Sequence, residues 1–144
     1  MASSGLGGGR QRQPPGPHVQ ARNIGYALDS LHTAARLGCA RFLFCGSQAE
    51  YGIADGVMGE EILCRPVSEY GKDKLEVCRR AGEEAKALGI DYIHARIFSV
   101  YGPGDHPWSL VSTCLNTFLK GGRMELGECT QQWNFLHVRD AARA

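Results

Sequence analysis

The chain has 144 residues, of which 43% are hydrophobic and 22% charged, a composition typical of a globular domain rather than a fibre. A net charge of +1 gives no electrostatic footprint for nucleic acid or an anionic membrane surface. The longest apolar runs, such as Phe42 to Cys45, fall far short of the roughly 20 residues that span a bilayer, and no signal-peptide pattern opens the chain. We therefore expect a cytoplasmic protein with no nucleic-acid and no membrane partner.

The cysteines and histidines predict neither disulfides nor a metal site. The six cysteines are spread through segments that resemble core, and no two form a C-x-x-C pair, so buried free thiols are expected. The five histidines have no spacing typical of metal ligands, so no metal is predicted.

Residues 1–22 are expected to form a disordered or non-native leader. The first 20 residues contain five glycines and three prolines, with too few apolar side chains to offset the entropy of ordering. The glycine-rich run Gly5 to Arg10 does not match a dinucleotide-binding turn, because no strand precedes it and Arg10 occupies the third glycine position.

A helix followed by a strand is predicted next. Apolar residues recur at helical spacing after Asn23, and the pattern stops at Gly38, a glycine suited to a helix C-terminus. Residues 41–45 form a short apolar run closed by Gly46 and Ser47, as expected for a strand buried on both faces of a parallel sheet.

A second helix and strand complete a βαβ unit. Residues 67–88 place Leu75, Cys78, Ala81, Ala85 and Leu88 on one side, and the helix should end at Gly89. Residues 90–100 are typical of another buried strand. The fold class is therefore α/β, and residues 23–102 are predicted to form part of a doubly wound parallel sheet.

Residues 103–144 are expected to begin a smaller region. A helix is predicted over 108–119, short strands over 124–126 and 133–138, and the start of a helix over 140–144. Because two central strands cannot by themselves make an open doubly wound sheet, we expect the chain to be incomplete at both ends.

Three polar side chains of this α/β unit could share one catalytic site. Tyr70 and Lys74 are four residues apart near the start of a helix, so both project from the same face, and a nearby ammonium favours the ionised form of a phenol. Ser47 follows a buried strand directly, where ligands bind in open α/β sheets. The spacing of Tyr70 and Lys74 alone is a weak signal, since an exposed aromatic beside a charge would also produce it.

The order and spacing of several motifs resemble the extended short-chain dehydrogenase/reductases, also called NAD-dependent epimerase/dehydratases. The similarity runs from about Asn23 to Ala144 and rests on Asn23, Ser47 to Gly52, Pro66 to Lys74, Arg96 to Asp105, and Phe135 to Ala142. It implies a partial Rossmann-like domain over 23–102 followed by the start of a substrate-binding region over 103–144. It also implies a central-to-C-terminal portion of such a protein, without the glycine-rich cofactor motif that the family carries nearer its N-terminus.

The resemblance assigns roles to individual residues. It implies a catalytic set of Ser47, Tyr70 and Lys74, with Tyr70 as proton donor or acceptor, Lys74 binding the nicotinamide ribose and Ser47 orienting the reacting oxygen. Cofactor contacts are implied for Asn23, Tyr70, Lys74, Ile97 and Phe98, and substrate contacts for Ser47, Gln48, Ala49, Ser99 and Trp133. Ser99 stands where many relatives have an asparagine, and Trp133 stands where sugar-nucleotide enzymes commonly have an arginine.

The implied activity is hydride transfer on a nucleotide-linked sugar by an epimerase, dehydratase or reductase, with NAD as cofactor and NADP as the alternative. This activity is expected of the full-length parent, and the present chain by itself is expected to be inactive. A homodimer is also possible for such a protein. Two other functions remain open: a non-catalytic dinucleotide-sensing or protein-interaction module, because members of a family can keep the fold and lose the chemistry, and an inactive truncated chain. His137 and Asp140 are interpreted as hydrogen-bonding and capping groups rather than as site residues.

Overall fold

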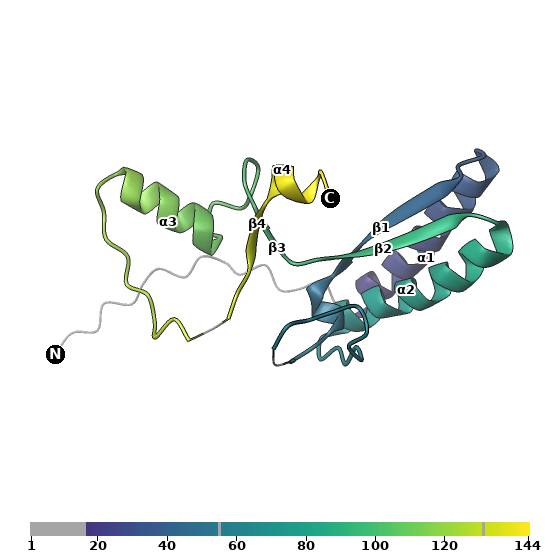
Figure 1. The fold of residues 1–144 in the computed structure, drawn as a ribbon, viewed down its shortest axis with the longest axis horizontal. Coiled ribbons are helices and arrows are strands. Elements are labelled where there is room, and N and C mark those ends of the chain that lie inside the picture. The colour runs from purple at the N-terminus through teal and green to yellow at the C-terminus, as the bar shows by residue number, and fades with distance from the viewer. Residues whose placement is uncertain (1–16, 55, 131) are drawn as a thin grey trace.

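The computed structural model describes residues 17–54, 56–130 and 132–144, which form two units joined near residue 98 (Figure 1). The first unit contains α1 (Pro17–Arg36), β1 (Arg41–Ser47), the 3-10 turn η1 (Gln48–Glu50), α2 (Glu69–Leu88) and β2 (Asp91–Ile97). The second contains β3 (Ser99–Tyr101), α3 (Leu110–Leu119), β4 (Phe135–His137) and α4 (Val138–Ala141). The predicted α/β class with parallel strands is confirmed, because β1 pairs with β2 and β3 with β4 in parallel.

Helix α1 begins at Pro17, before the predicted start at Asn23. Proline suits the first helical position, where its missing N–H costs no hydrogen bond. Residues 17–22 are therefore helical instead of a disordered leader, while the rest of the predicted leader, residues 1–16, lies outside the described residues. The helix ends as predicted near Gly38, whose φ of 75° belongs to the left-handed region that glycine tolerates.

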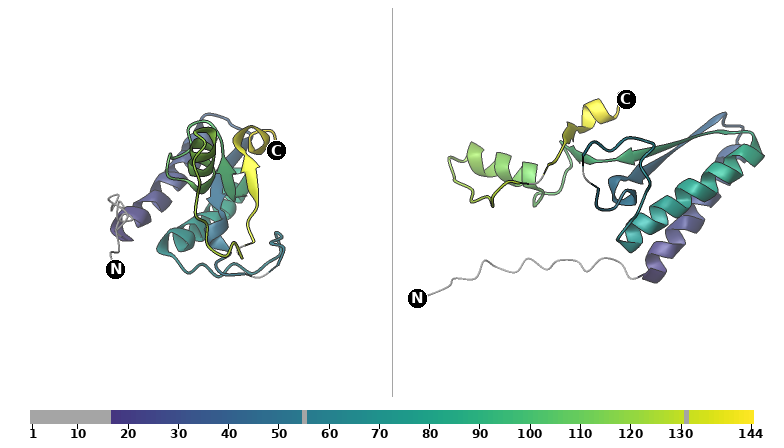
Figure 2. Two further views of the ribbon diagram at one scale, coloured as in Figure 1. Left: turned by 90° about the vertical axis from the view of Figure 1, so that its left-hand side faces the viewer. Right: turned by 60° about the horizontal axis from the view of Figure 1, so that its bottom comes forward.

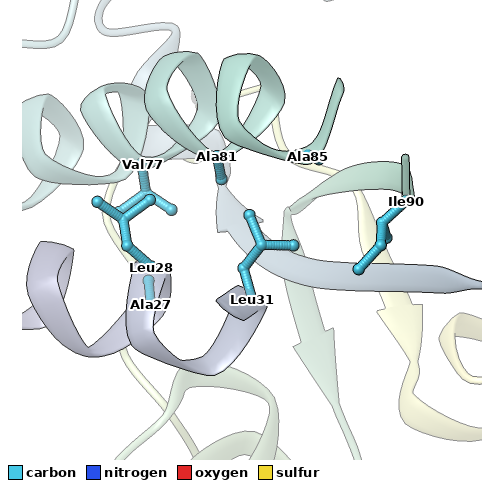
Figure 3. Packing of buried hydrophobic residues seen from close by; sticks show 7 residues of the cluster. All are labelled: Ala27, Leu28, Leu31, Val77, Ala81, Ala85 and Ile90. Atoms are coloured by element: carbon cyan, nitrogen blue, oxygen red, sulfur yellow. The ribbon is translucent and has the colours of Figure 1, made fainter. Parts of the chain in front are cut away.

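Helix α2 has a cap at each end. The Ser68 side chain accepts a hydrogen bond of 3.1 Å from the Gly71 N–H, and Gly89 closes the helix with a φ of 70°. Its buried face packs against α1, with Leu31 in the centre at 0% exposure (Figure 3). The core residues of the two helices and the following loop are Ala27, Leu28, Leu31, Val77, Ala81, Ala85 and Ile90.

The apolar face predicted for α2 is correct only in part. Ala81 and Ala85 are buried, but Val77 takes the core position, while Cys78 is half-buried and Leu88 is exposed. Small alanines allow α1 and α2 to approach closely, which brings Leu31 and Val77 into the same core (Figure 3).

Strands β1 and β2 are covered on one face only, which corrects the prediction of a strand buried on both faces. Both helices lie on the same side of this sheet (Figure 2), where Phe42, Phe44 and Tyr92 pack against the helical core. On the other face Leu43 is 56% exposed and Ile93 is also exposed. An apolar run shows that a strand is suited to burial, but it does not show how many helices cover it.

The predicted strand over 90–100 is divided at Phe98. The last pair of the β1–β2 register is Ser47 with Ile97, and beyond Ser47 the chain turns into η1, so β2 loses its partner. Residues 99–101 then pair with β4 instead. The division between the two sheets therefore falls before the domain boundary expected at residue 102.

The second unit differs from its predicted elements at several ends. Helix α3 starts at Leu110 rather than at residue 108, because the Ser109 side chain caps it through a 3.3 Å hydrogen bond from the Ser112 N–H. The strand predicted over 124–126 does not form, and the described residues offer it no neighbouring strand. The strand predicted over 133–138 is limited to β4, and the helix expected over 140–144 is the short α4, which starts at Val138.

Two smaller predictions concern capping and cysteines. His137 caps α4 by accepting a 3.2 Å hydrogen bond at Nδ1 from the Arg139 N–H, which confirms a structural role for this side chain. The six cysteines are free, as predicted, but none is fully buried: three are exposed (Cys39, Cys45, Cys129) and three are half-buried (Cys64, Cys78, Cys114).

Within the described residues, no helix has the length and hydropathy needed to cross a bilayer.

Candidate active site

The start of α2 lies directly against the turn that follows β1. A side chain at Gly71 would collide with the backbone carbonyl of Ala49, so only glycine allows this approach. Ser47 lies two residues before Ala49, and Tyr70 directly precedes Gly71. The close packing therefore brings the strand end that carries Ser47 next to the helical turn that carries Tyr70.

Lys74 connects α2 to β1 through a hydrogen bond. Its Nζ donates to the Cys45 carbonyl oxygen at 2.6 Å and lies 4.6 Å from the centroid of the Phe44 ring. The same ammonium lies 5.7 Å from the Tyr70 ring centroid. The structure thus brings Tyr70 and Lys74 together on one helical face, while one of the three ammonium hydrogens is used by the strand backbone.

A cavity of about 150 Å³ joins Asn23 to this pair. Its lining comes from α1, β1 and α2 and consists of Asn23, Ile24, Phe44, Tyr70, Asp73, Lys74 and Val77. Three of the residues predicted to contact a cofactor, Asn23, Tyr70 and Lys74, therefore share one cavity. This volume suits one end of a dinucleotide rather than a whole one.

The other predicted site residues lie around the end of β2. Ile97 is the register partner of Ser47, and the Phe98 ring packs on the Tyr51 ring with centroids 6.0 Å apart. Ser99 lies with Phe98 in a second cavity of about 230 Å³ between β3 and α3.

The remaining predicted substrate contacts are divided between two places. Gln48 and Ala49 form η1 beside Ser47. Trp133 is exposed in the segment before β4 and lines neither of the two cavities. The structure therefore brings Gln48 and Ala49, but not Trp133, next to the other predicted residues.

A buried charged cluster beside Ser47 was not predicted. The Glu50 side chain is completely buried, and its carboxylate accepts from Arg96 Nε at 2.8 Å and pairs with His94 Nε2 at 2.9 Å. The phenol of Tyr92 pairs with His94 Nδ1 at 2.7 Å. The one feature of the sequence that could have indicated a role for Glu50 is its position three residues after Ser47, which matches the spacing of a capping box.

The pKa values of Glu50 and His94 favour their charged forms. Burial alone would raise the pKa of Glu50, but its hydrogen bonds with His94 and Arg96 outweigh burial and lower that pKa. Burial would likewise lower the pKa of His94, yet its interactions with Cys78 and Glu50 raise it to about 9. The cluster is therefore a buried ion pair with a second cation, Arg96, on the same carboxylate.

The same cluster contains three groups that could in principle bind a metal. Donor atoms of Glu50, Cys78 and His94 all lie within 4.8 Å of one another. However, the Arg96 guanidinium donates to Glu50 and also lies 4.0 Å from the Cys78 sulfur. A metal cation would have to displace this charge, so the donor set does not favour a metal.

Comparison with known proteins identifies the family. The model of the NAD dependent epimerase/dehydratase family matches residues 5–144. The chain belongs to the NAD dependent epimerase/dehydratase family. The predicted resemblance is confirmed, and the match includes part of the segment that had been expected to be a leader.

Individual relatives agree with this assignment. The uncharacterized UDP-glucose epimerase YtcB of Bacillus subtilis (strain 168) is 27% identical over 125 residues, which are 85% of this chain and 39% of that protein. The structure of MoeE5 in complex with UDP-glucuronic acid and NAD is 35% identical with a TM-score of 0.71, over 84% of this chain and 42% of MoeE5.

A third structure supports the fold alone. The UDP-N-acetylglucosamine 4-epimerase of Methanobrevibacter ruminantium M1, in complex with UDP-N-acetylmuramic acid, has a TM-score of 0.77 at 22% identity. The comparison covers 88% of this chain and 43% of that epimerase. The chain thus spans about two fifths of the length of the relatives that it matches.

Proposed function

We propose that this chain carries the catalytic residues of an NAD-dependent enzyme that modifies a nucleotide-linked sugar. The observation that carries the proposal is the shared cavity of Asn23, Tyr70 and Lys74, next to the strand end that bears Ser47. MoeE5, a relative at 35% identity, is known in complex with NAD and with UDP-glucuronic acid or UDP-glucose, so we propose UDP-sugars as the substrate class. The cytoplasm is the proposed location.

The described residues fit the nicotinamide-ribose end of NAD. Lys74 keeps two ammonium hydrogens that the Cys45 carbonyl does not use, and these could bind ribose hydroxyls beside Asn23. Ile97 and Phe98, at the end of β2, would supply the apolar contacts to the nicotinamide. When bound, NAD supplies the hydride acceptor.

The chemistry assigned to this chain is proton transfer at a sugar hydroxyl. Tyr70 Oη takes the proton of the hydroxyl while hydride leaves the same carbon, so that a ketone forms. Lys74, on the same helical face as Tyr70, supports the phenolate by its positive charge. Ser47 Oγ donates a hydrogen bond to the reacting oxygen, and Gln48, Ala49, Ser99 and Trp133 are proposed to contact the sugar nucleotide.

The test compares two tyrosine variants of the protein that contains this sequence. Tyr70→Phe removes the phenolic oxygen of the site, whereas Tyr26→Phe changes an exposed tyrosine of α1 that lies outside this cavity. Each protein is incubated with NAD and UDP-glucuronic acid or UDP-glucose, products are separated by chromatography, and NAD binding is measured by calorimetry. We expect Tyr70→Phe to abolish turnover while NAD binding is retained, and Tyr26→Phe to behave as wild type.

Two results would overturn the proposal. Equal turnover by Tyr70→Phe and wild type would show that this phenol is not the acid/base group. Absence of turnover in the wild type would also overturn the proposal. NAD binding would then distinguish a dinucleotide-sensing module, which binds NAD, from a protein-interaction module or an inactive chain, which does not.

A further inference from the structure

The Glu50 carboxylate is fixed from two strands at once. Its side chain has 0% exposure, and it interacts with Arg96 at 2.8 Å and His94 at 2.9 Å, both on β2. On the β1 side it accepts a 2.8 Å hydrogen bond from the Ser47 N–H. A buried carboxylate is costly unless its oxygens are paired, so this arrangement holds Glu50 in one place.

The same contacts restrain Ser47. Ser47 is the N-cap of η1, with φ of −149° and ψ of 146°, and its Oγ accepts a 3.2 Å hydrogen bond from the Ala49 N–H. Glu50 completes the capping box by binding the Ser47 N–H. Because the Ala49 N–H occupies an acceptor position of the hydroxyl, the Ser47 O–H remains available to donate outward.

Gly46 makes room for this arrangement. A Cβ at Gly46 would collide with His94 Nε2 and lie 2.6 Å from Glu50 Oε1. The His94–Glu50 pair therefore passes directly over the backbone of the residue before Ser47. The register supports this contact, since Gly46 pairs with Arg96 and Phe44 with His94.

We propose that Glu50, held by His94 and Arg96, is a positioning residue that sets the direction of the Ser47 hydroxyl for the reaction. This inference rests on the proposed function, because it assigns Ser47 a reacting oxygen to orient. Glu50 itself does not touch the substrate, since its side chain is fully buried. Its contribution should therefore appear in the rate of the chemical step and not in substrate affinity.

The first part of the test measures Ser47 directly by NMR. In the wild-type chain the Ser47 amide should resonate at low field and exchange slowly with solvent, unlike the amide of Val57, which belongs to an exposed loop. Glu50→Ala should remove both signatures. The matched control is Glu84→Gln, which changes another Glu–His pair: Glu84 is half-buried on α2, lies 2.7 Å from His32 of α1, and is far from Ser47 in the sequence.

The second part measures turnover of UDP-glucuronic acid with NAD. Glu50→Gln preserves the size of the side chain and an oxygen acceptor for the Ser47 N–H, but loses the charge that Arg96 and His94 bind. We expect kcat to fall roughly 10- to 100-fold with KM changed less than about twofold, because misplacement of a reacting group lowers the rate without loss of binding. Glu84→Gln should retain wild-type kcat.

The outcomes separate this proposal from the proposed function. If wild type turns over UDP-glucuronic acid and folded Glu50→Gln has unchanged kcat, Glu50 does not position Ser47, although the enzyme assignment stands. If wild type is inactive, the enzyme assignment fails, and the NMR measurement alone decides whether Glu50 fixes Ser47. A wild-type Ser47 amide that exchanges as fast as that of Val57 overturns the positioning role even if the variants fail to fold.

Discussion

Replacing His94 by glutamine tests whether the buried charge cluster stabilises the fold in a pH-dependent way. His94 has only 7% side-chain exposure and interacts with Glu50, Tyr92 and Cys78. An unfolded histidine has a pKa of about 6.5, whereas His94 in the fold has a pKa of about 9. A difference of this size corresponds to about 3 kcal/mol of stability in the protonated state.

The direction of the pH dependence follows from proton uptake on folding. Because the folded pKa is above the unfolded one, the stabilisation is complete below about pH 6.5 and is lost as the pH rises through about 9. Glu50 acts in a different window: its lowered pKa stabilises the fold above the ordinary pKa of 4.5, and this contribution is lost in acid. The two windows do not overlap, so His94 can be measured alone on the alkaline side.

The assay is urea denaturation of wild type and His94→Gln at several pH values. We expect the variant to be less stable by up to about 3 kcal/mol near pH 6, and the difference to shrink as the pH approaches roughly 10. His32→Gln, which removes an exposed histidine paired with Glu84, should change stability by less than about 1 kcal/mol. Parallel pH profiles of wild type and His94→Gln would refute the reasoning, because the cluster would then not bind its proton more tightly in the folded state.

Two further predictions concern packing and can be measured by thermal or urea denaturation. Gly71→Ala should destabilise the fold by about 1–3 kcal/mol, because the new methyl group collides with the Ala49 carbonyl. As a control, Gly25→Ala on α1 meets open space and should be neutral or stabilising by about 0.5–1 kcal/mol. Equal effects of the two substitutions would contradict the contact between Gly71 and Ala49. Leu31→Ala should lower the free energy of unfolding by about 2–5 kcal/mol because Leu31 is fully buried. Leu37 is 77% exposed, so Leu37→Ala should change stability by less than about 0.5 kcal/mol. A small effect of Leu31→Ala would show that α1 and α2 do not form the core.

The local part of this structure could be predicted from the sequence, because local signals determine it. Gly38 and Gly89 mark helix ends through their left-handed backbone conformation, and both helices end near them. The spacing of Tyr70 and Lys74 likewise required only helical geometry, and both side chains line one cavity. Asn23 in the same cavity came from the resemblance to the family and not from any local pattern.

What could not be predicted depends on contacts between distant segments. The Glu50 cluster forms because the β1–β2 register places His94 and Arg96 beside Phe44 and Gly46, and the sequence does not contain that register. Position 71 requires glycine because a side chain there would collide with the carbonyl of Ala49, which is distant in the sequence. The exposure of Leu43 depends on both helices lying on the same face of the sheet (Figure 2), which an apolar run cannot reveal.

The proposed catalytic residues all belong to the first unit, whereas the second unit carries only proposed substrate contacts. Asn23, Ser47, Tyr70 and Lys74 all belong to the α1, β1 and α2 unit, whose mutual positions depend on one helical core and on the backbone contact at Gly71. Ser99 and Trp133 belong to the second unit, which follows the first directly after Ile97 (Figure 1). Substitutions in the second unit should therefore alter which sugar nucleotide is accepted, whereas loss of the Gly71 contact or of the Glu50 cluster should lower the rate for every substrate.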